Sequence, residues 1–229
     1  SPELTVSPAE ANGNIRVDDN YSYSEPQAAQ GSDKKLAQWD PSFRATPSDA
    51  NQVSTDGAAA GQGNFSYAHL PPLGGRRVKW SNTFSATEAI IGNRGPAYVG
   101  NGSGATLTWA LRPAPGNANT GYGADSVTLL IHGGRSNWSG NIAYNDNHVN
   151  FETRPDPETT PFTFQSLPAG QKSQFDNVFV NENDNTRIQE GNERQLGGNA
   201  ANNTNNYLRS YGGGTQTGTT LTQLEVFFD

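Results

Sequence analysis

The chain has 229 residues and a mass of 24.5 kDa, which is enough to bury one substantial hydrophobic core or two small ones. Its formal net charge of −7 argues against nucleic acid as a partner, because phosphates need a basic face, and equally against a polybasic membrane anchor. It contains no Cys, which excludes disulfides, thiolate metal sites and thiol nucleophiles.

Most of the polarity comes from uncharged side chains. Only 16% of the residues are charged, against about a quarter in ordinary globular domains, whereas the chain holds 26 Gly and 14 Pro. Such a composition suits β-strands joined by long turns, since Asn and Gly tolerate positive φ and Pro fixes φ at the start of a turn. Four Trp, eight Tyr and ten Phe argue against a fully disordered chain.

The sequence predicts no membrane span in this chain, because no apolar stretch approaches the roughly 18 residues that cross a bilayer. The chain opens on Ser1-Pro2 and contains no Met, so we expect a processed or truncated product. Any membrane segment is then expected upstream of Ser1. The lack of both oxidisable sulfur residues fits an extracellular or cell-surface location.

Residues 1–60 are the most polar stretch and are predicted to form an extended N-terminal arm. Apolar pairs spaced by two, such as Leu4 with Val6 and Ile15 with Val17, favour extended segments that lie on a neighbour. Residues 34–39 are compatible with one or two helical turns. An arm that follows the surface is favoured over an independent domain, and the pattern leaves both open.

Residues 61–229 are predicted to form a β-rich globular domain. Residues 106–111 alternate cleanly between polar and apolar side chains, which is the strand period. Residues 126–131 are the best candidate for a buried strand. Residues 85–91 are compatible with a short helix capped by Ser85, and equally with a buried strand over 89–92.

A β-hairpin over residues 142–151 is the clearest local prediction. Ile142 and Tyr144 alternate with polar residues on one arm, and Val149 and Phe151 do so on the other. Residues 145–147 (Asn-Asp-Asn) supply turn chemistry, since Asn and Asp accept the left-handed backbone region that a tight connection needs.

Further strands are predicted around Phe162 and Phe164, at residues 175–180, and at 224–228 near the end of the chain. Residues 181–206 are predicted to be a long loop rich in Asn, Glu and Gly. The predicted fold class is therefore mainly β, with a single antiparallel-sheet domain, long loops, little helix and an extended N-terminal arm.

The hairpin segment resembles a known family signature. Residues 132–151 contain a His, a small-residue turn, an apolar strand, and then the four residues 145–148 at the predicted tip. This order resembles the C-terminal "H-x9-DG" hairpin of pilin-like, pseudopilin-like proteins that are abundant in planctomycetes and verrucomicrobia. The signature residues in this comparison are His132, Asn145, Asp146, Asn147 and His148.

Two further stretches extend the resemblance. Residues 42–49 are similar to the family's "FxCPSD" segment without its Cys, and residues 89–96 resemble its "ADRxP" strand. In this chain thirteen residues rather than nine separate His132 from Asp146, and Asn147 replaces the Gly. The family also begins with a prepilin cleavage site and a long apolar helix that stacks in the filament core, and this sequence contains neither. The resemblance implies a pilin-like subunit that assembles into a filament.

No catalytic set is recognised in the sequence. Of the three histidines, His69, His132 and His148, none accompanies a G-x-S-x-G segment or another nucleophile pattern. His132 is expected to hydrogen-bond the hairpin backbone, and His148 is expected at a solvated strand start. We therefore predict that the protein is not an enzyme.

No cofactor is predicted, and calcium is the one ion considered in detail. Residues 181–185 (Asn-Glu-Asn-Asp-Asn) are rich in oxygen donors, with Glu182 and Asp184 as candidate ligands, but they lack the Gly and the final Glu of an EF-hand. Secretion pseudopilins commonly hold calcium in a C-terminal loop, which supports the candidate. A solvated Asn-rich turn remains the favoured interpretation. Convergence of His132, Asp146 and His148 on a metal is a further alternative, which no recognised spacing supports.

Two functions remain as hypotheses. The first is a non-catalytic structural protein of the bacterial cell surface, or of an extracellular filament or layer, whose copies associate through β contacts. The second is a secreted binding module for carbohydrate, or for calcium-dependent adhesion. The second requires aromatic rings on one exposed face, and Trp80, Trp109 and Trp138 are the candidates, although such rings more often belong to a core.

Overall fold

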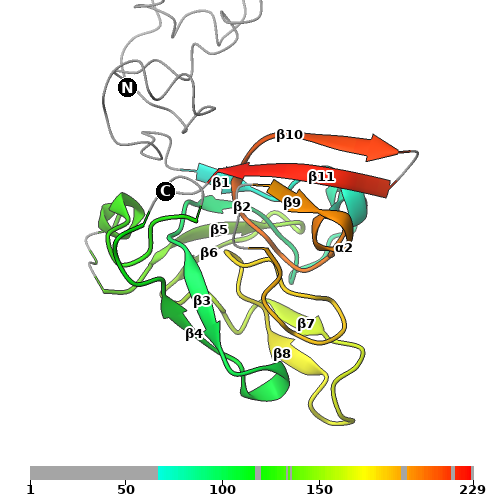
Figure 1. Ribbon diagram of the computed structural model, residues 1–229, viewed down its shortest axis with the longest axis horizontal. Helices are drawn as coiled ribbons and strands as arrows, with labels where there is room; N and C mark the ends of the chain where they lie inside the picture. Colours follow the sequence, from blue (N-terminus) through cyan, green and yellow to red (C-terminus); the bar gives the residue numbers. More distant parts are fainter. Residues whose placement is uncertain are drawn as a thin grey trace, which may run out of the picture. The chain divides into compact units, whose positions relative to one another are not determined.

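The computed structural model describes residues 67–116, 120–132, 134, 136–191, 195–217 and 220–227 (Figure 1). All strand pairings among these residues are antiparallel, and helix is limited to four short segments. The predicted mainly β, antiparallel fold with little helix is therefore confirmed. The predicted arm over 1–60 lies outside the described residues, and so do its turns at 34–39 and the segment 42–49.

The strands in the described part of the chain belong to four small sheets. They are β1 (Tyr67–His69), β2 (Ala89–Asn93), β3 (Tyr98–Asn101), β4 (Thr108–Leu111), β5 (Gly140–Tyr144), β6 (Val149–Glu152), β7 (Pro161–Thr163), β8 (Ser173–Phe175), β9 (Gln195–Gly197), β10 (Ser210–Thr217) and β11 (Thr220–Phe227). The helical segments are the 3₁₀ turns η4 (Gly74–Trp80), η5 (Gly104–Thr106) and η6 (Val127–Leu130), and the single α-helical turn α2 (Gly198–Ala201). None of the described helices is long and apolar enough to cross a bilayer.

The central sheet has the order β1-β2-β5-β6. One of its faces covers the main core, where Ile142 and Tyr144 of β5 pack with Trp138, Phe179 and Leu208. Ile142 and Tyr144 are both buried because the residues of a strand alternate between the two faces of the sheet, so every second residue of β5 points inward. The other face of the sheet carries β-strand side chains that remain exposed.

A second sheet, of order β10-β11-β9, has a core of its own. Leu196 of β9 pairs with Leu224 of β11, and both are buried together with Tyr207. A β-bridge between His69 and Arg209 joins this sheet to β1. The hairpins β3–β4 and β7–β8 form the remaining two sheets and extend from the same side of the central sheet, in the lower half of Figure 1.

Several local predictions are confirmed. The predicted hairpin is β5–β6, with Ile142 paired to Asn150 and Ala143 to Val149. The strand expected within 106–111 is β4, and the one expected around Phe162 is β7. The open alternative at 85–91 is resolved as the strand β2, because the Ser85 hydroxyl accepts a bond from the Thr87 N–H (3.4 Å) in a local turn instead of capping a helix.

The predicted buried strand over 126–131 is wrong. These residues form η6, where the Ser126 hydroxyl accepts a hydrogen bond from the Thr128 N–H (3.2 Å) and caps the turn. Leu129 points into the core while Leu130 is exposed. A short apolar run does not distinguish a buried strand from a helical turn. Here the helical turn forms because Ser126 caps its start.

Two predictions near the C-terminal half also need correction. The strand expected over 175–180 ends at Phe175, because the Asn177 side chain accepts a hydrogen bond from the Phe179 N–H (2.9 Å) and turns the chain. The loop expected over 181–206 contains β9 and α2, since Leu196 and Ala201 are buried against β11. The strand expected to close the chain is β11, whose described residues end at Phe227.

Candidate functional site

The hairpin tip between β5 and β6 brings four of the five signature residues together. Asn147 has φ of 70°, in the left-handed region that the sequence predicted, and its N–H bonds the carbonyl of Tyr144 (2.9 Å). The Asp146 carboxylate accepts bonds from the ring Nδ1 and from the backbone N–H of His148. The imidazole of His148 in turn stacks on the ring of Tyr144, with centroids 4.3 Å apart.

The tip is anchored to the rest of the domain by Asn145. Its side-chain amide donates to the carbonyls of Lys79 and Ser81, and its backbone N–H donates to the carbonyl of Glu88 (3.0 Å). The hairpin therefore ends in a fixed turn rather than a free one.

His132 is not part of this tip. Its Nε2 lies 3.0 Å from the side-chain oxygen of Asn93, at the other end of the β5–β6 hairpin. The prediction that His132 bonds the hairpin backbone directly is wrong. The side-chain oxygen of Asn93 accepts from the backbone N–H of Asn141 in the hairpin (2.7 Å), so Asn93 lies between His132 and that backbone. His132 is thus separated from Asp146 by about five strand residues, roughly 16 Å, and the two do not converge on a common site with His148.

The β6 strand is the open end of the central sheet. At the opposite end, His69 of β1 exchanges N–H to carbonyl bonds (3.1 and 3.2 Å) with Arg209, the residue directly before β10. Within the described part of the chain, β6 has no strand on its far side. Its outward-facing Val149 and Phe151 are 60% and 54% exposed, unusually high for large apolar side chains on a strand.

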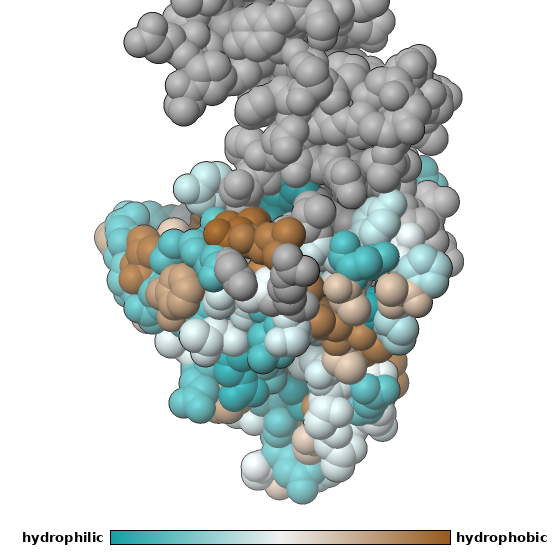
Figure 2. Space-filling model, turned by 90° about the vertical axis from the view of Figure 1, so that its left-hand side faces the viewer, coloured by the Kyte–Doolittle hydropathy of each residue, from teal (hydrophilic) through white to brown (hydrophobic). Residues whose placement is uncertain are grey.

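The exposed apolar surface continues across the outer face of the sheet. Ile91 of β2 and Val149 of β6 both pair with Ala143 of β5, so these three side chains form one row. Phe151 and Tyr67 lie two residues away from this row on β6 and β1. Figure 2 shows apolar areas, in brown, between polar ones on the face that it presents. Exposed apolar patches of this kind mark interaction surfaces.

The two candidate calcium ligands point to different places. Asp184 is used by the chain itself, because its carboxylate accepts bonds from the N–H and hydroxyl of Thr204 (2.7 to 2.9 Å) and from the Asn205 N–H. Glu182 is completely buried, and its Oε1 accepts from the Asn177 N–H (2.9 Å). No group of three or more His, Cys, Asp and Glu side chains with the proximity for a metal ion occurs among the described residues.

The interior around Glu182 is a polar cluster that the sequence did not reveal. Burial, together with the charge of Asp176, raises the pKa of Glu182 well above its usual value, and burial also raises the pKa of Asp176. Asn205 donates to the Asp176 carboxylate (3.0 Å) and accepts from Arg76 (2.6 Å). Arg187 lies 3.5 Å from Glu182. The hydrogen bonds of these groups lie mostly within the cluster, although Oε2 of Glu182 and Nη1 of Arg76 are buried without a hydrogen-bond partner among the described residues.

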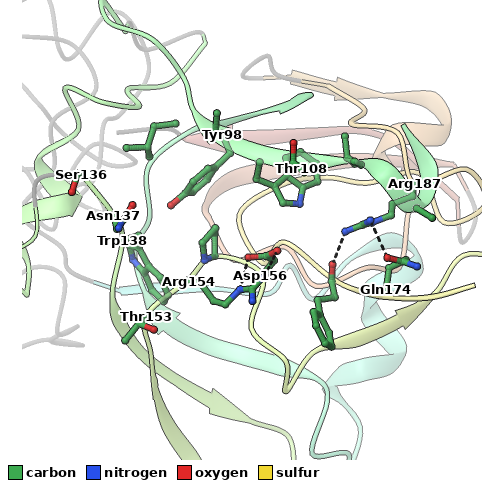
Figure 3. Close-up of a pocket in the computed structure, with 17 residues that line it drawn as sticks. Tyr98, Thr108, Ser136, Asn137, Trp138, Thr153, Arg154, Asp156, Gln174 and Arg187 are labelled. Carbon is green, nitrogen blue, oxygen red and sulfur yellow. Dashed lines mark hydrogen bonds and ion pairs between the residues drawn. The ribbon is translucent and has the colours of Figure 1, made fainter. Parts of the chain in front are cut away.

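A hollow of about 720 Å³ lies between the β3–β4 and β7–β8 hairpins. Figure 3 shows the Arg154–Asp156 ion pair on its wall, with Ser136 and Asn137 toward one side and Gln174 and Arg187 toward the other. Arg154 also lies over the ring of Phe175, which is partly exposed. Polar groups beside aromatic rings are the usual composition of a small-molecule site.

The three candidate tryptophans do not share a face. Trp138 is 0% exposed and donates its indole N–H to the carbonyl of Arg94 (2.8 Å), so it belongs to the core even though it backs the hollow. Trp109 is half-buried at the hollow. Trp80 is exposed beside a different, shallower depression near Ile91 and Asn145. The core interpretation holds for Trp138 and in part for Trp109, which packs against the same core.

Comparison with known proteins gives no relative for this chain. No family model matches it, and neither the curated proteins nor the solved structures contain a significant match.

Proposed function

We propose that this chain is a non-catalytic structural subunit of the bacterial cell surface, or of an extracellular filament or layer, whose copies associate through β contacts. The single observation that carries the proposal is the open β6 edge with Val149 and Phe151 exposed beside it. An unpaired, apolar edge strand is a template for another strand, and monomeric proteins usually protect such edges with charge, Pro or bulges.

The sequence of β6 contains few of the features that protect an edge strand from pairing with another strand. Its four residues, Val-Asn-Phe-Glu, include no Lys and no Pro, and the β5–β6 ladder has no irregularity. By contrast, the ladder between β10 and β11 contains two register shifts, one of which inserts an extra residue in β10 between Tyr211 and Gly213. Because bulges twist an edge away from a partner, β10 is less suited to strand addition than β6.

The hairpin that carries the resemblance to pilin-like proteins is the same hairpin that provides this edge. Its tip is fixed by the side-chain hydrogen bonds of Asn145 and by the left-handed conformation of Asn147. Strand addition draws its affinity from backbone hydrogen bonds and its specificity from the side chains beside them. The proposed role therefore needs rigidity at this edge and no reactive group.

The test is the association state of the full chain with Val149→Pro and Val149→Ala. Pro is tolerated on an edge strand where its missing N–H faces away from the sheet, and it blocks addition of another strand there. Both variants lose the Val side chain, but Ala retains the N–H. We expect sedimentation velocity and electron microscopy to show oligomers for the native chain and for Val149→Ala, and their loss in Val149→Pro. A native chain that stays monomeric at high concentration, with calcium present, contradicts the proposal.

Carbohydrate binding is the second candidate, and the hollow beside Trp109 favours it. The indole N–H of Trp109 is buried and has no hydrogen-bond partner among the described residues, and the Arg154–Asp156 pair offers both a donor and an acceptor. Sugar hydroxyls need such paired groups next to an aromatic ring. A glycan array with the native chain and with Trp109→Ala tests this candidate. Retention that the variant loses is the expected result, and an absence of retention by the native chain excludes the candidate.

A further inference from the structure

We propose that two copies of this chain pair through antiparallel β6 strands about a twofold axis at Asn150. In this register, Val149 lies opposite Phe151 of the partner subunit, and His148 lies opposite Glu152 of the partner subunit. The inference rests on the proposed self-association through β6 and adds the register and the symmetry of the contact.

The hydrogen bonds of the β5–β6 ladder determine which backbone groups of β6 are open. Tyr144 donates its N–H to the carbonyl of His148 (3.0 Å), so this pair is hydrogen-bonded. Hydrogen-bonded and non-hydrogen-bonded pairs alternate along an antiparallel ladder. Asn150, opposite Ile142, and Glu152, opposite Gly140, therefore also direct their backbone groups toward β5.

Val149 and Phe151 consequently direct their N–H and carbonyl groups away from β5, to the open edge. No other backbone or side-chain bond to these four groups is present within the described part of the chain. Each copy therefore offers the open backbone groups of two β6 residues. Only one antiparallel register of two β6 strands places both open residues of each copy opposite open residues of the other. Val149 must lie opposite Phe151 of the partner subunit, which forms four hydrogen bonds; either neighbouring register, in which Val149 or Phe151 lies opposite itself, forms two.

The side chains agree with this register on both faces. On the outer face, Val149 and Phe151 of each copy meet the same two residues of the other, and this extends the apolar row that contains Ile91 and Ala143. On the inner face, His148 meets the carboxylate of Glu152 of the partner subunit, twice by symmetry. Asp146 occupies Nδ1 of His148, which leaves Nε2 for this contact. Oε1 of Glu152 accepts from the hydroxyls of Tyr144 and Thr159 in its own chain, which leaves Oε2.

The contact is isologous, because the same strand is used by both copies, and it joins two four-stranded sheets into one of eight strands. An isologous contact closes at two copies. A filament or layer built from this chain therefore uses the β6 pair as its repeating unit and needs a second surface for growth.

The absence of Cys from the sequence allows a clean crosslinking test on the full chain. Asn150 pairs with itself across the axis as a non-hydrogen-bonded pair, with Cα atoms about 4.5 Å apart, within the range of a disulfide. Val149 of the two copies is offset by two residues, about 7 Å along the strand. Mild oxidation of Asn150→Cys should give covalent dimers about tenfold faster than oxidation of Val149→Cys, which lies outside disulfide range.

Sedimentation of the native chain, which needs no substitution, separates the two proposals. Association together with fast crosslinking at position 150 supports the register. Association without an advantage of Asn150→Cys over Val149→Cys overturns the register and leaves self-association intact. A monomeric native chain overturns both. Circular dichroism of the reduced variants tests whether each is folded. Asn150→Ser is the control for loss of the Asn150 side chain, and it should associate like the native chain.

Discussion

The negative charge of Asp176 acts on the carboxyl group of Glu182 inside the protein, and both residues are completely shielded from solvent. Burial, and then the charge of Asp176, raises the pKa of Glu182. Arg187 and the cations Arg76 and Lys79 near Asp176 oppose this effect without cancelling it. Glu182 therefore holds its proton more tightly in the folded protein than it does in water.

This pair predicts a pH-dependent stability. Between the pKa of Glu182 in the unfolded chain, about 4.3, and its raised value in the folded protein, the folded state binds the extra proton. The resulting stability is fully present below the unfolded pKa and is lost as the pH rises through the folded pKa. Glu182→Gln, which imitates the protonated form, should be increasingly more stable than the native chain as the pH rises, by up to about 1.4 kcal/mol per pH unit in this window.

Urea unfolding at several pH values between 5 and 8 measures this difference. Glu158→Gln is the control, because it removes one carboxylate from an exposed position. A constant difference between Glu182→Gln and the native chain would show that Glu182 titrates normally.

Asn205 holds the same cluster together, and its replacement should be costly. Its side-chain amide donates to the Asp176 carboxylate and to the carbonyls of Val180 and Asn206, while its oxygen accepts from Arg76. Asn205→Ala leaves several buried polar groups without partners, so we expect a loss of about 3 kcal/mol of stability. Asn101→Ala, at an exposed strand position, should change the free energy of unfolding by less than about 0.5 kcal/mol. Similar melting curves for the two variants would contradict this account.

The sequence predicted the parts of the fold that depend on local pattern. The β5–β6 hairpin was predictable because alternation on both arms agreed with the turn residues between them, and Asn147 adopts the positive φ expected of it. The buried cluster was not predictable, since the bonds between Arg76 and Asn205 join positions 129 residues apart and no local pattern identifies them. For the same reason Glu182 was a candidate calcium ligand in a predicted Asn-rich loop, whereas the structure buries it completely.

The open edge was only partly predictable. Alternation placed Val149 and Phe151 on one side of a strand, but it could not say whether that side faced the core. The exposure of both side chains follows from the sheet order, which puts Ile142 and Tyr144 of β5 on the core side and leaves β6 at the end. Sheet order is a property of long-range pairing, which the periodicity of one segment does not contain.

The hairpin tip gives a prediction with a built-in control. Asn147 has φ of 70°, where a side chain with a Cβ is strained unless it is Asn or Asp, and no side-chain bond of Asn147 is present in the described structure. Asn147→Gly should therefore be neutral or slightly stabilising, whereas Asn147→Ala should lose about 1 kcal/mol. Both changes remove the same amide, so a difference in their thermal midpoints isolates the backbone effect. Equal midpoints would place Asn147 outside the left-handed region.

Gly95, directly after β2 and Arg94, should tolerate no side chain. A Cβ added there would lie 2.5 Å from ring carbons of Phe179, and Phe179 packs edge-on against Trp138 (centroids 4.7 Å apart) in the main core. Phe179 is buried in this core, so Gly95→Ala should cost about 1 to 3 kcal/mol through overpacking. At Gly197 an added Cβ would meet only the carbonyl of Thr222 at 3.9 Å, and Gly197→Ala should stay within about 0.5 kcal/mol of the native chain. Urea unfolding of the two variants, with Trp fluorescence to report on Trp138, tests the prediction. If Gly95→Ala unfolds at the native urea concentration, the close packing of Phe179 over Gly95 is refuted.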